Sequence, residues 1–194
     1  MQSAPRFLLF DPSGDAWPSV RLPQVAFAGR SNVGKSSLLN ALAGRSRLAR
    51  VSNTPGRTRG IALFEVEGRY AFADLPGYGF AKVSRAERDA WKTLVEGYLE
   101  RCRFLRRVYV LVDPRRGPGE EEHLLAGFLL AKSVSFRWVG TKMDKLSARE
   151  RVQACARFDG EAWLAAGAPV LLTSARTKAG IDRLWGDIRS AFSP

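Results

Sequence analysis

The chain has 194 residues, which fits one domain with a short extension. Hydrophobic residues make up 45% and charged residues 26%, a composition that excludes global disorder. No apolar run approaches the roughly 20 residues that cross a bilayer, and Phe7–Phe10 is too short for a signal peptide. We therefore expect a cytoplasmic protein with no membrane partner. Cys102 and Cys155 lack metal-ligand spacing and fit free thiols.

The charge is strongly basic. Lys and Arg number 31 against 19 Asp and Glu, which gives a net charge of +12. Such an excess attracts polyanions and makes their binding salt-dependent. One interpretation is a nucleic-acid partner, and the other is a solvated, arginine-rich surface. The arginines are spread along the chain instead of forming a tail, so we expect a charged face on a folded domain.

The first part of the chain predicts a strand, a loop and a helix in succession. Phe7–Phe10 fits a short strand at a sheet edge, and residues 11–23 are turn-rich. Apolar residues at 25–28 predict a strand that ends at Gly29. The leucines of Lys35–Ala43 lie on one side of a predicted helix, which Gly44 ends.

Beyond that helix, the pattern alternates between strands and helices. Residues 45–58 are basic and broken by Pro55-Gly56, so they predict a loop. Ser84 and Glu87 have the spacing of a capping box. The further predicted strands are 61–66 and 70–73, joined as a hairpin, then 108–112, 136–139 and 170–172. The further predicted helices are 85–101, 120–131, 148–158, 161–166 and 181–192.

This alternation predicts an α/β fold of three layers. We expect a mostly parallel sheet of six or seven strands, with one antiparallel strand from the hairpin and helices on both faces. Residues 1–22 form a predicted N-terminal extension that packs on the domain, and residues 23–194 form a single domain.

One glycine-rich segment follows the first buried strand and opens a helix. Its residues are Gly29-Arg30-Ser31-Asn32-Val33-Gly34-Lys35-Ser36, which match G-x-x-x-x-G-K-[ST]. The backbone N–H groups of such a loop bind phosphate, aided by the helix N-terminus. Lys35 would reach the β- and γ-phosphates, and the Ser36 hydroxyl would bind Mg²⁺. This motif serves GTPases, ATPases and nucleotide kinases alike.

A second motif follows the hairpin. Asp74-Leu75-Pro76-Gly77 fits D-x-x-G, in which Asp74 would hold Mg²⁺ through a water and the Gly77 N–H would contact the γ-phosphate. A contact that exists only in the triphosphate state can order a loop that hydrolysis releases. By itself this motif is weak.

Two further motifs select the base. In Thr141-Lys142-Met143-Asp144, the Asp144 carboxylate can accept from guanine N1–H and N2–H₂, a donor pair that adenine lacks. The Lys142 stem can lie along the purine. In Thr173-Ser174-Ala175, the Ala175 N–H could bind guanine O6. Four motifs in this order, each at a strand end, predict a phosphate-loop GTPase with the Ras-like fold, GTP or GDP as ligand and Mg²⁺ as cofactor.

The chain resembles the EngB (YsxC/YihA) family of bacterial GTPases over roughly residues 5–193. The residues that carry the resemblance are Gly29 to Ser37, Thr54-Pro55-Gly56-Arg57-Thr58, Asp74 to Val83, and Thr141-Lys142-Met143-Asp144. GTPases at large carry Asn where this chain has Thr141, and the resemblance accounts for the Thr. It also implies nucleotide contacts from Ser37, Gly56, Arg57, Leu75, Pro76, Met143, Thr173 and Ser174.

The resemblance further implies that Thr58 is the switch I ligand of Mg²⁺, with Thr54 as the alternative. Lys35, Thr58 and Gly77 would then be the residues that support hydrolysis. The partner that the family implies is the large ribosomal subunit, through rRNA and ribosomal protein, with effects on cell division and septation. We expect a monomer.

Hydrolysis by the isolated protein is expected to be slow. Many GTPases carry Gln after D-x-x-G to orient the attacking water, and a phenol such as that of Tyr78 cannot orient water in the same way. Tyr78, Phe80 and Lys82 could stack on RNA or pack against the sheet, and both interpretations stay open. His123 is expected at the surface without a catalytic role. The tryptophans are expected to anchor the core.

Other functions fit less well. A small-molecule kinase would need a lid and an acceptor pocket, and an ATPase would not explain Asp144. An RNA-binding domain with an inactive nucleotide site would not explain Lys35, Ser36 and Asp74 together. A GTPase that acts directly on the division machinery remains the alternative.

Overall fold

The computed structural model describes residues 4–45, 48, 60–79, 84–159 and 169–193. Several predicted features lie outside these residues. They are most of the loop at 45–58, with Thr54, Gly56, Arg57 and Thr58, then Phe80, Lys82, Trp163 and the helix predicted at 161–166. In the described part, no helix is both long and apolar enough to cross a membrane.

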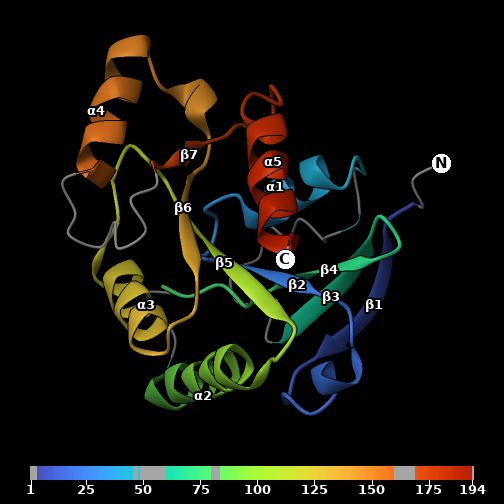
Figure 1. Ribbon diagram of the computed structural model, residues 1–194. Helices are drawn as coiled ribbons and strands as arrows, with labels where there is room; N and C mark the ends of the chain where they lie inside the picture. Colours follow the sequence, from blue (N-terminus) through green and yellow to red (C-terminus); the bar gives the residue numbers. More distant parts are fainter. Residues whose placement is uncertain (1–3, 46–47, 49–59, 80–83, 160–168, 194) are drawn as a thin grey trace.

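In the described part of the chain, seven strands form one sheet in the order β1-β3-β4-β2-β5-β6-β7 (Figure 1). The sheet is parallel from β4 through β7, and β3 is antiparallel to both of its neighbours, β1 and β4. The predicted sheet with one antiparallel strand is therefore confirmed. The strands are β1 (Arg6–Asp11), β2 (Gln24–Gly29), β3 (Ile61–Val66), β4 (Tyr70–Asp74), β5 (Leu105–Val112), β6 (Phe136–Gly140) and β7 (Leu171–Leu172).

Helices cover both faces of the sheet, as predicted. The described helices are α1 (Lys35–Leu42), α2 (Arg85–Arg101), α3 (Glu120–Ala131), α4 (Ala148–Asp159) and α5 (Ile181–Phe192), with short 3₁₀ turns η1 (Trp17–Ser19) and η2 (Met143–Lys145). Helices α1 and α5 share one core with one face of the sheet, and α2, α3 and α4 share the other core with the opposite face (Figure 1).

Strand β2 shows how the sequence produces this layering. All six of its residues are buried, because its side chains alternate between two covered faces. Val25 and Phe27 pack with α1 and α5, whereas Ala26 and Ala28 pack on the side of α2 and α3. The small alanines allow the second helix layer to approach the sheet closely.

The tryptophans and cysteines largely behave as expected. Trp17 and Trp138 are buried, and Trp91 and Trp185 are partly buried against the cores. Cys102 and Cys155 are free thiols. His123 is half-buried on α3.

Strand β5 is longer than predicted, because it begins at Leu105 and not at residue 108. Its first residues include Arg106 and Arg107, whose charge hides the strand pattern in the sequence. The Arg107 guanidinium donates to Asp187 Oδ1 on α5 at 2.7 Å, so the charge is balanced by an acid that is distant in sequence.

The turn-rich segment before β2 is organised around the buried Asp11 carboxylate. Its Oδ1 accepts from the backbone N–H groups of Ser13, Gly14 and Asp15, and Oδ2 accepts from those of Ala16 and Trp17. Burial alone would raise the pKa of Asp11, but the N–H donors outweigh it and lower the pKa below 3.8. Asp11 thus fixes the path from β1 to η1.

We expect Asp11→Ala to lower the free energy of unfolding by about 2 kcal/mol, because it leaves buried N–H groups without an acceptor. Asp11→Asn, with one acceptor oxygen, should lose less. Since the folded pKa is lowered, the contribution of the carboxylate is complete above pH 3.8 and is lost as the pH falls through the folded value. Urea unfolding at several pH values measures this. The difference in unfolding free energy between wild type and Asp11→Asn should shrink in acid. A difference that stays constant with pH would contradict this role of the carboxylate.

Candidate functional site

The phosphate-loop motif lies between the end of β2 and the start of α1. Gly29 is required by packing, since a Cβ there would lie 2.9 Å from Val33 Cγ1 and 3.0 Å from Leu111 Cβ. Gly34 has φ of 109° and caps the N-terminus of α1. The loop thus places the free N–H groups of a helix start at the carboxyl edge of the sheet, where anions bind.

Two opposite charges meet inside this loop. Lys35, in the first turn of α1, and Asp74, at the end of β4, are both buried, and Lys35 Nζ forms an ion pair with Asp74 Oδ1. Residues 39 positions apart are joined here because β2 and β4 are parallel neighbours. Lys35 can neutralise phosphate, and Asp74 can accept from metal-bound water.

The donors present fit Mg²⁺. Magnesium is usually held by one or two carboxylates or hydroxyls together with substrate phosphates and waters. Ser36, next to Lys35 on α1, and the buried Asp74 carboxylate supply such oxygens. Among the described residues, no group of three or more His, Cys, Asp or Glu side chains is placed to hold a metal ion. When bound, Mg²⁺ would neutralise charge on the phosphates.

The segment after Asp74 runs beside the phosphate loop. Leu75 N–H donates to Phe27 O at 3.1 Å, and the Ser31 N–H donates to Tyr78 O at 2.9 Å. A Cβ on Gly77 would lie 3.4 Å from Ser31 N, so Gly77 lies against the loop. The backbone of this segment is therefore within reach of the same ligand as the loop.

Tyr78 packs inward. Its side chain is 7% exposed, and its ring meets the Trp91 ring edge-on at 5.5 Å, while Trp91 Nε1 donates to Pro76 O. Burial, followed by the nearby Glu122 carboxylate, raises the pKa of Tyr78 well above 10. The two interpretations left open for Tyr78 were stacking on RNA and packing against the sheet, and the structure shows its side chain packed inside the protein.

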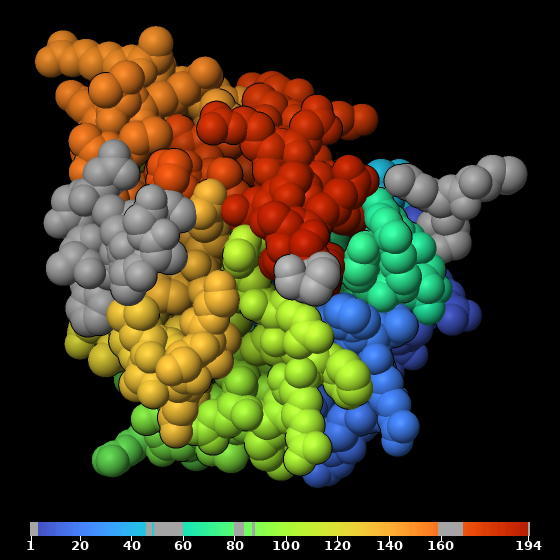
Figure 2. Space-filling view, in the orientation of Figure 1, coloured from blue at the N-terminus to red at the C-terminus, as the bar shows by residue number. Residues whose placement is uncertain are grey.

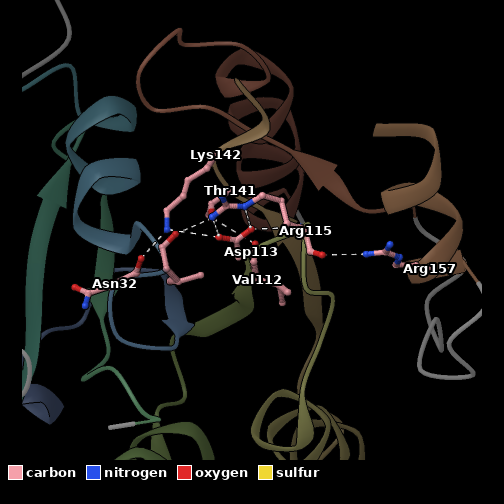
Figure 3. Close-up of polar contacts among 8 residues, drawn as sticks. Asn32, Val112, Asp113, Arg115, Thr141, Lys142 and Arg157 are labelled. Carbon is pink, nitrogen blue, oxygen red and sulfur yellow. Dashed lines mark hydrogen bonds and ion pairs between the residues drawn. The ribbon is translucent and has the colours of Figure 1, made fainter. Parts of the chain in front are cut away.

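The residues after β6 contact the phosphate loop directly (Figure 3). Thr141 is buried, and its hydroxyl lies 2.7 Å from Val33 O and 3.3 Å from Val112 O. Lys142 Nζ donates to Asn32 O at 2.8 Å. Lys142 itself has φ of 55°, a left-handed conformation that turns the chain toward η2. The predicted base and phosphate motifs thus lie in contact with each other.

Asp144 and Ser174 meet across the ends of β6 and β7. Ser174 Oγ donates to Asp144 Oδ1 at 2.6 Å, and Arg176 Nε donates to Asp144 Oδ2 at 2.9 Å. These donors, Ser174 first, lower the pKa of Asp144, which stays ionised at neutral pH. A carboxylate that these side chains hold in place can use its remaining lone pairs to accept from two parallel N–H donors.

The loop of residues 173–180 is tied to β6. The Thr173 N–H donates to Gly140 O at 2.7 Å, and the Met143 N–H donates to Thr173 O at 2.9 Å. Ala175 follows at the surface of this loop, half-buried. Gly180 closes it with φ of 75° and caps α5. The predicted residues of both base motifs are therefore brought together.

Three polar residues of the site were not predicted from the sequence. They are Asp113, Arg115 and Arg176. Asp113 directly follows β5, between the ends of β2 and β6, and lies 3.7 Å from Lys142 Nζ. The signal was available, because Asp113 follows a continuous apolar strand in the same way as Asp74 and the Thr141 motif do.

Comparisons with known proteins match most of the chain. A family profile described as "50S ribosome-binding GTPase" matches residues 24–138. The "Probable GTP-binding protein EngB" of Anaeromyxobacter dehalogenans strain 2CP-C is 46% identical over 180 residues, covering 88% of this chain and 83% of that protein. The protein of the same name from Geobacter metallireducens is 46% identical over 172 residues, covering 89% and 84%.

Solved structures share the fold. The crystal structure of a probable GTP-binding protein EngB has a TM-score of 0.68 at 24% identity, covering 87% of this chain and 97% of that chain. Era from Aquifex aeolicus, bound to GDP and aluminium fluoride, has a TM-score of 0.67 at 24% identity, covering 87% and 56%.

Gly180→Ala should disrupt the loop that holds Ser174. A Cβ at this position would lie inside contact distance of Leu172 O, and φ of 75° is unfavourable for alanine. We expect a loss of about 3 kcal/mol in unfolding free energy. Gly186→Ala is the matched control, since a Cβ there meets nothing within 4 Å on α5 and should stabilise by about 0.5–1 kcal/mol. Equal effects in urea unfolding would contradict this.

Proposed function

Because this chain belongs to the EngB family of GTP-binding proteins, a family of GTPases, we propose that it assists assembly of the large ribosomal subunit as a GTP-gated factor. It binds guanine nucleotide and hydrolyses GTP. We further propose that hydrolysis is slow in the isolated protein. Normal cell division and septation would depend on the protein through its role in ribosome assembly. The printed description of the matching family, "50S ribosome-binding GTPase", supports the ribosomal target.

The proposed nucleotide contacts follow the geometry of the sheet edge. Gly29–Ser37 would bind the phosphates, with Lys35 and the Gly77 N–H at the γ-phosphate. Ser36 and, through water, Asp74 would hold Mg²⁺, and Thr58 completes this set in our proposal. Lys142, Asp144 and the Thr173–Ala175 loop would bind guanine.

The single observation that carries the gating is the contact between the Gly77 segment and the phosphate loop. The Tyr78 carbonyl accepts from the Ser31 N–H, and Trp91 on α2 binds Pro76 O. A γ-phosphate placed at Gly77 would therefore act on a segment that α2 also contacts. Such a link lets the nucleotide change a surface that a partner can read.

The charge of the protein supports an rRNA partner. Exposed basic side chains follow the base motif along η2 and α4, at Lys145, Arg149, Arg151 and Arg157. Figure 2 shows this segment in orange, standing out from the upper left of the molecule. Exposed basic side chains on a protruding helix, within a net charge of +12, suit contact with a phosphate backbone.

The placement of Tyr78 supports the proposal of slow hydrolysis. Its ring is buried and packed against Trp91, so its hydroxyl is not available to position a water as a Gln side chain would. The protein supplies positioning and charge neutralisation, which are the larger part of phosphoryl-transfer catalysis, but lacks a water-orienting residue at this position. A partner would complete the site.

Asp144→Asn tests base recognition. The amide replaces one acceptor oxygen with a donor, so it mismatches guanine N1–H or N2–H₂ and matches the xanthine C2 carbonyl. We expect GDP affinity to fall at least about 100-fold while XDP affinity rises. Asp182→Asn, an exposed acid on α5, is the control. Fluorescence titration measures both, and unchanged GDP affinity would remove Asp144 from the base site.

Co-sedimentation with large ribosomal subunits tests the target. At two salt concentrations, we expect binding with a non-hydrolysable GTP analogue that survives moderate salt, and weak binding with GDP or no nucleotide. GTP turnover in the same samples should rise when subunits are present. The Asp144→Asn variant should respond to xanthosine nucleotides instead. Binding that ignores nucleotide and vanishes with salt would indicate non-specific attraction, and the division machinery would become the preferred target.

A further inference from the structure

Asp113 lies at the carboxyl end of β5, between the phosphate loop and the residues after β6. Its side chain is 15% exposed. The Arg115 guanidinium donates two hydrogen bonds to this carboxylate, from Nε to Oδ1 at 2.8 Å and from Nη2 to Oδ2 at 2.5 Å. Lys142 Nζ lies 3.7 Å from Oδ2 (Figure 3). One carboxylate therefore faces two cations.

Lys142 needs such a partner. Its flexible stem has four rotatable bonds, and holding it in one place costs side-chain entropy. The backbone carbonyl of Asn32 accepts from its ammonium at 2.8 Å, but it carries no net charge. Asp113 supplies the negative charge on the other side of the same ammonium, so the stem is held at both the phosphate loop and β5.

Arg115 in turn fixes Asp113. Its side-chain hydrogen bonds are the main reason that the pKa of Asp113 is lowered, with a smaller contribution from the charge of Lys142. The Arg115 carbonyl accepts from Arg157 Nη1 on α4 at 3.1 Å, which holds the loop after β5 in place (Figure 3). Asp113 is thus an ionised group with a defined position.

We propose that Asp113 is a positioning residue of the guanine site: its carboxylate holds the Lys142 stem where the stem can lie along the purine. This inference rests on the proposed placement of Lys142 in that site. It assigns Asp113 no contact with nucleotide. Asp113 acts only through Lys142, so its effect on binding depends on Lys142 being present.

A double-mutant cycle tests this dependence. The proteins are wild type, Asp113→Asn, Lys142→Ala and the double variant, and the measurement is the dissociation constant of a fluorescent GDP analogue. We expect Asp113→Asn to weaken binding about three- to tenfold in the wild-type background, as for a partly exposed ion pair. In the Lys142→Ala background, the same change should alter binding by less than about twofold.

Asp15→Asn is the matched control, because it removes the same charge from an exposed loop position. Thermal melting of each protein shows whether it is folded. If Asp113→Asn weakens binding equally in both backgrounds, or leaves it unchanged in the wild type, the positioning role is wrong. If Lys142→Ala leaves GDP affinity unchanged, the placement of Lys142 in the guanine site is itself wrong, and the two failures are thus distinguished.

Discussion

The pairing of Lys35 with Asp74 governs how the site is built. A buried charge is costly unless an opposite charge and hydrogen bonds compensate it, so each residue requires the other to be near. Asp74 ends β4 and Lys35 begins α1, and only the parallel pairing of β2 with β4 brings them together. A phosphate and a cation would provide each with a stronger partner. In the proposed site, the pair would therefore link ligand binding to the position of the segment that follows Asp74.

Side-chain contacts also join separate segments on the guanine side of the sheet's carboxyl edge. The Thr141 hydroxyl joins the end of β6 to the phosphate loop, and Ser174 joins β7 to Asp144. In each contact, a side chain just after a strand bonds to the backbone or carboxylate of another segment at the same edge of the sheet. Because the ends of parallel strands lie level, short side chains suffice. The site is thereby one unit made from four separate segments of sequence.

Much of this could be predicted from the sequence, and the misses have physical reasons. The motifs at Gly29, Asp74, Thr141 and Thr173 each follow an apolar strand, so periodicity placed them at the same edge. Asp113 lies in the same position, but it belongs to no short motif, and its importance depends on Lys142 being near in space. The start of β5 was missed because the charge of Arg107 is balanced by Asp187, eighty residues later. Local sequence patterns predict strands and loops, whereas pairs of charges that are distant in sequence can be identified only once the fold is known.

Strand β1 has a consequence for how the chain is assembled during synthesis. Among the described strands it pairs with β3 alone, from Arg6 to Asp11. Translation must therefore proceed through β2, α1 and β3 as far as Glu65 before β1 can pair along its length. At about 5–20 residues per second, the apolar side chains of β1 wait for seconds in the nascent chain. This edge strand is made before its partner and stays unpaired until β3 is complete. During that time chaperones can reach Phe7 and Phe10.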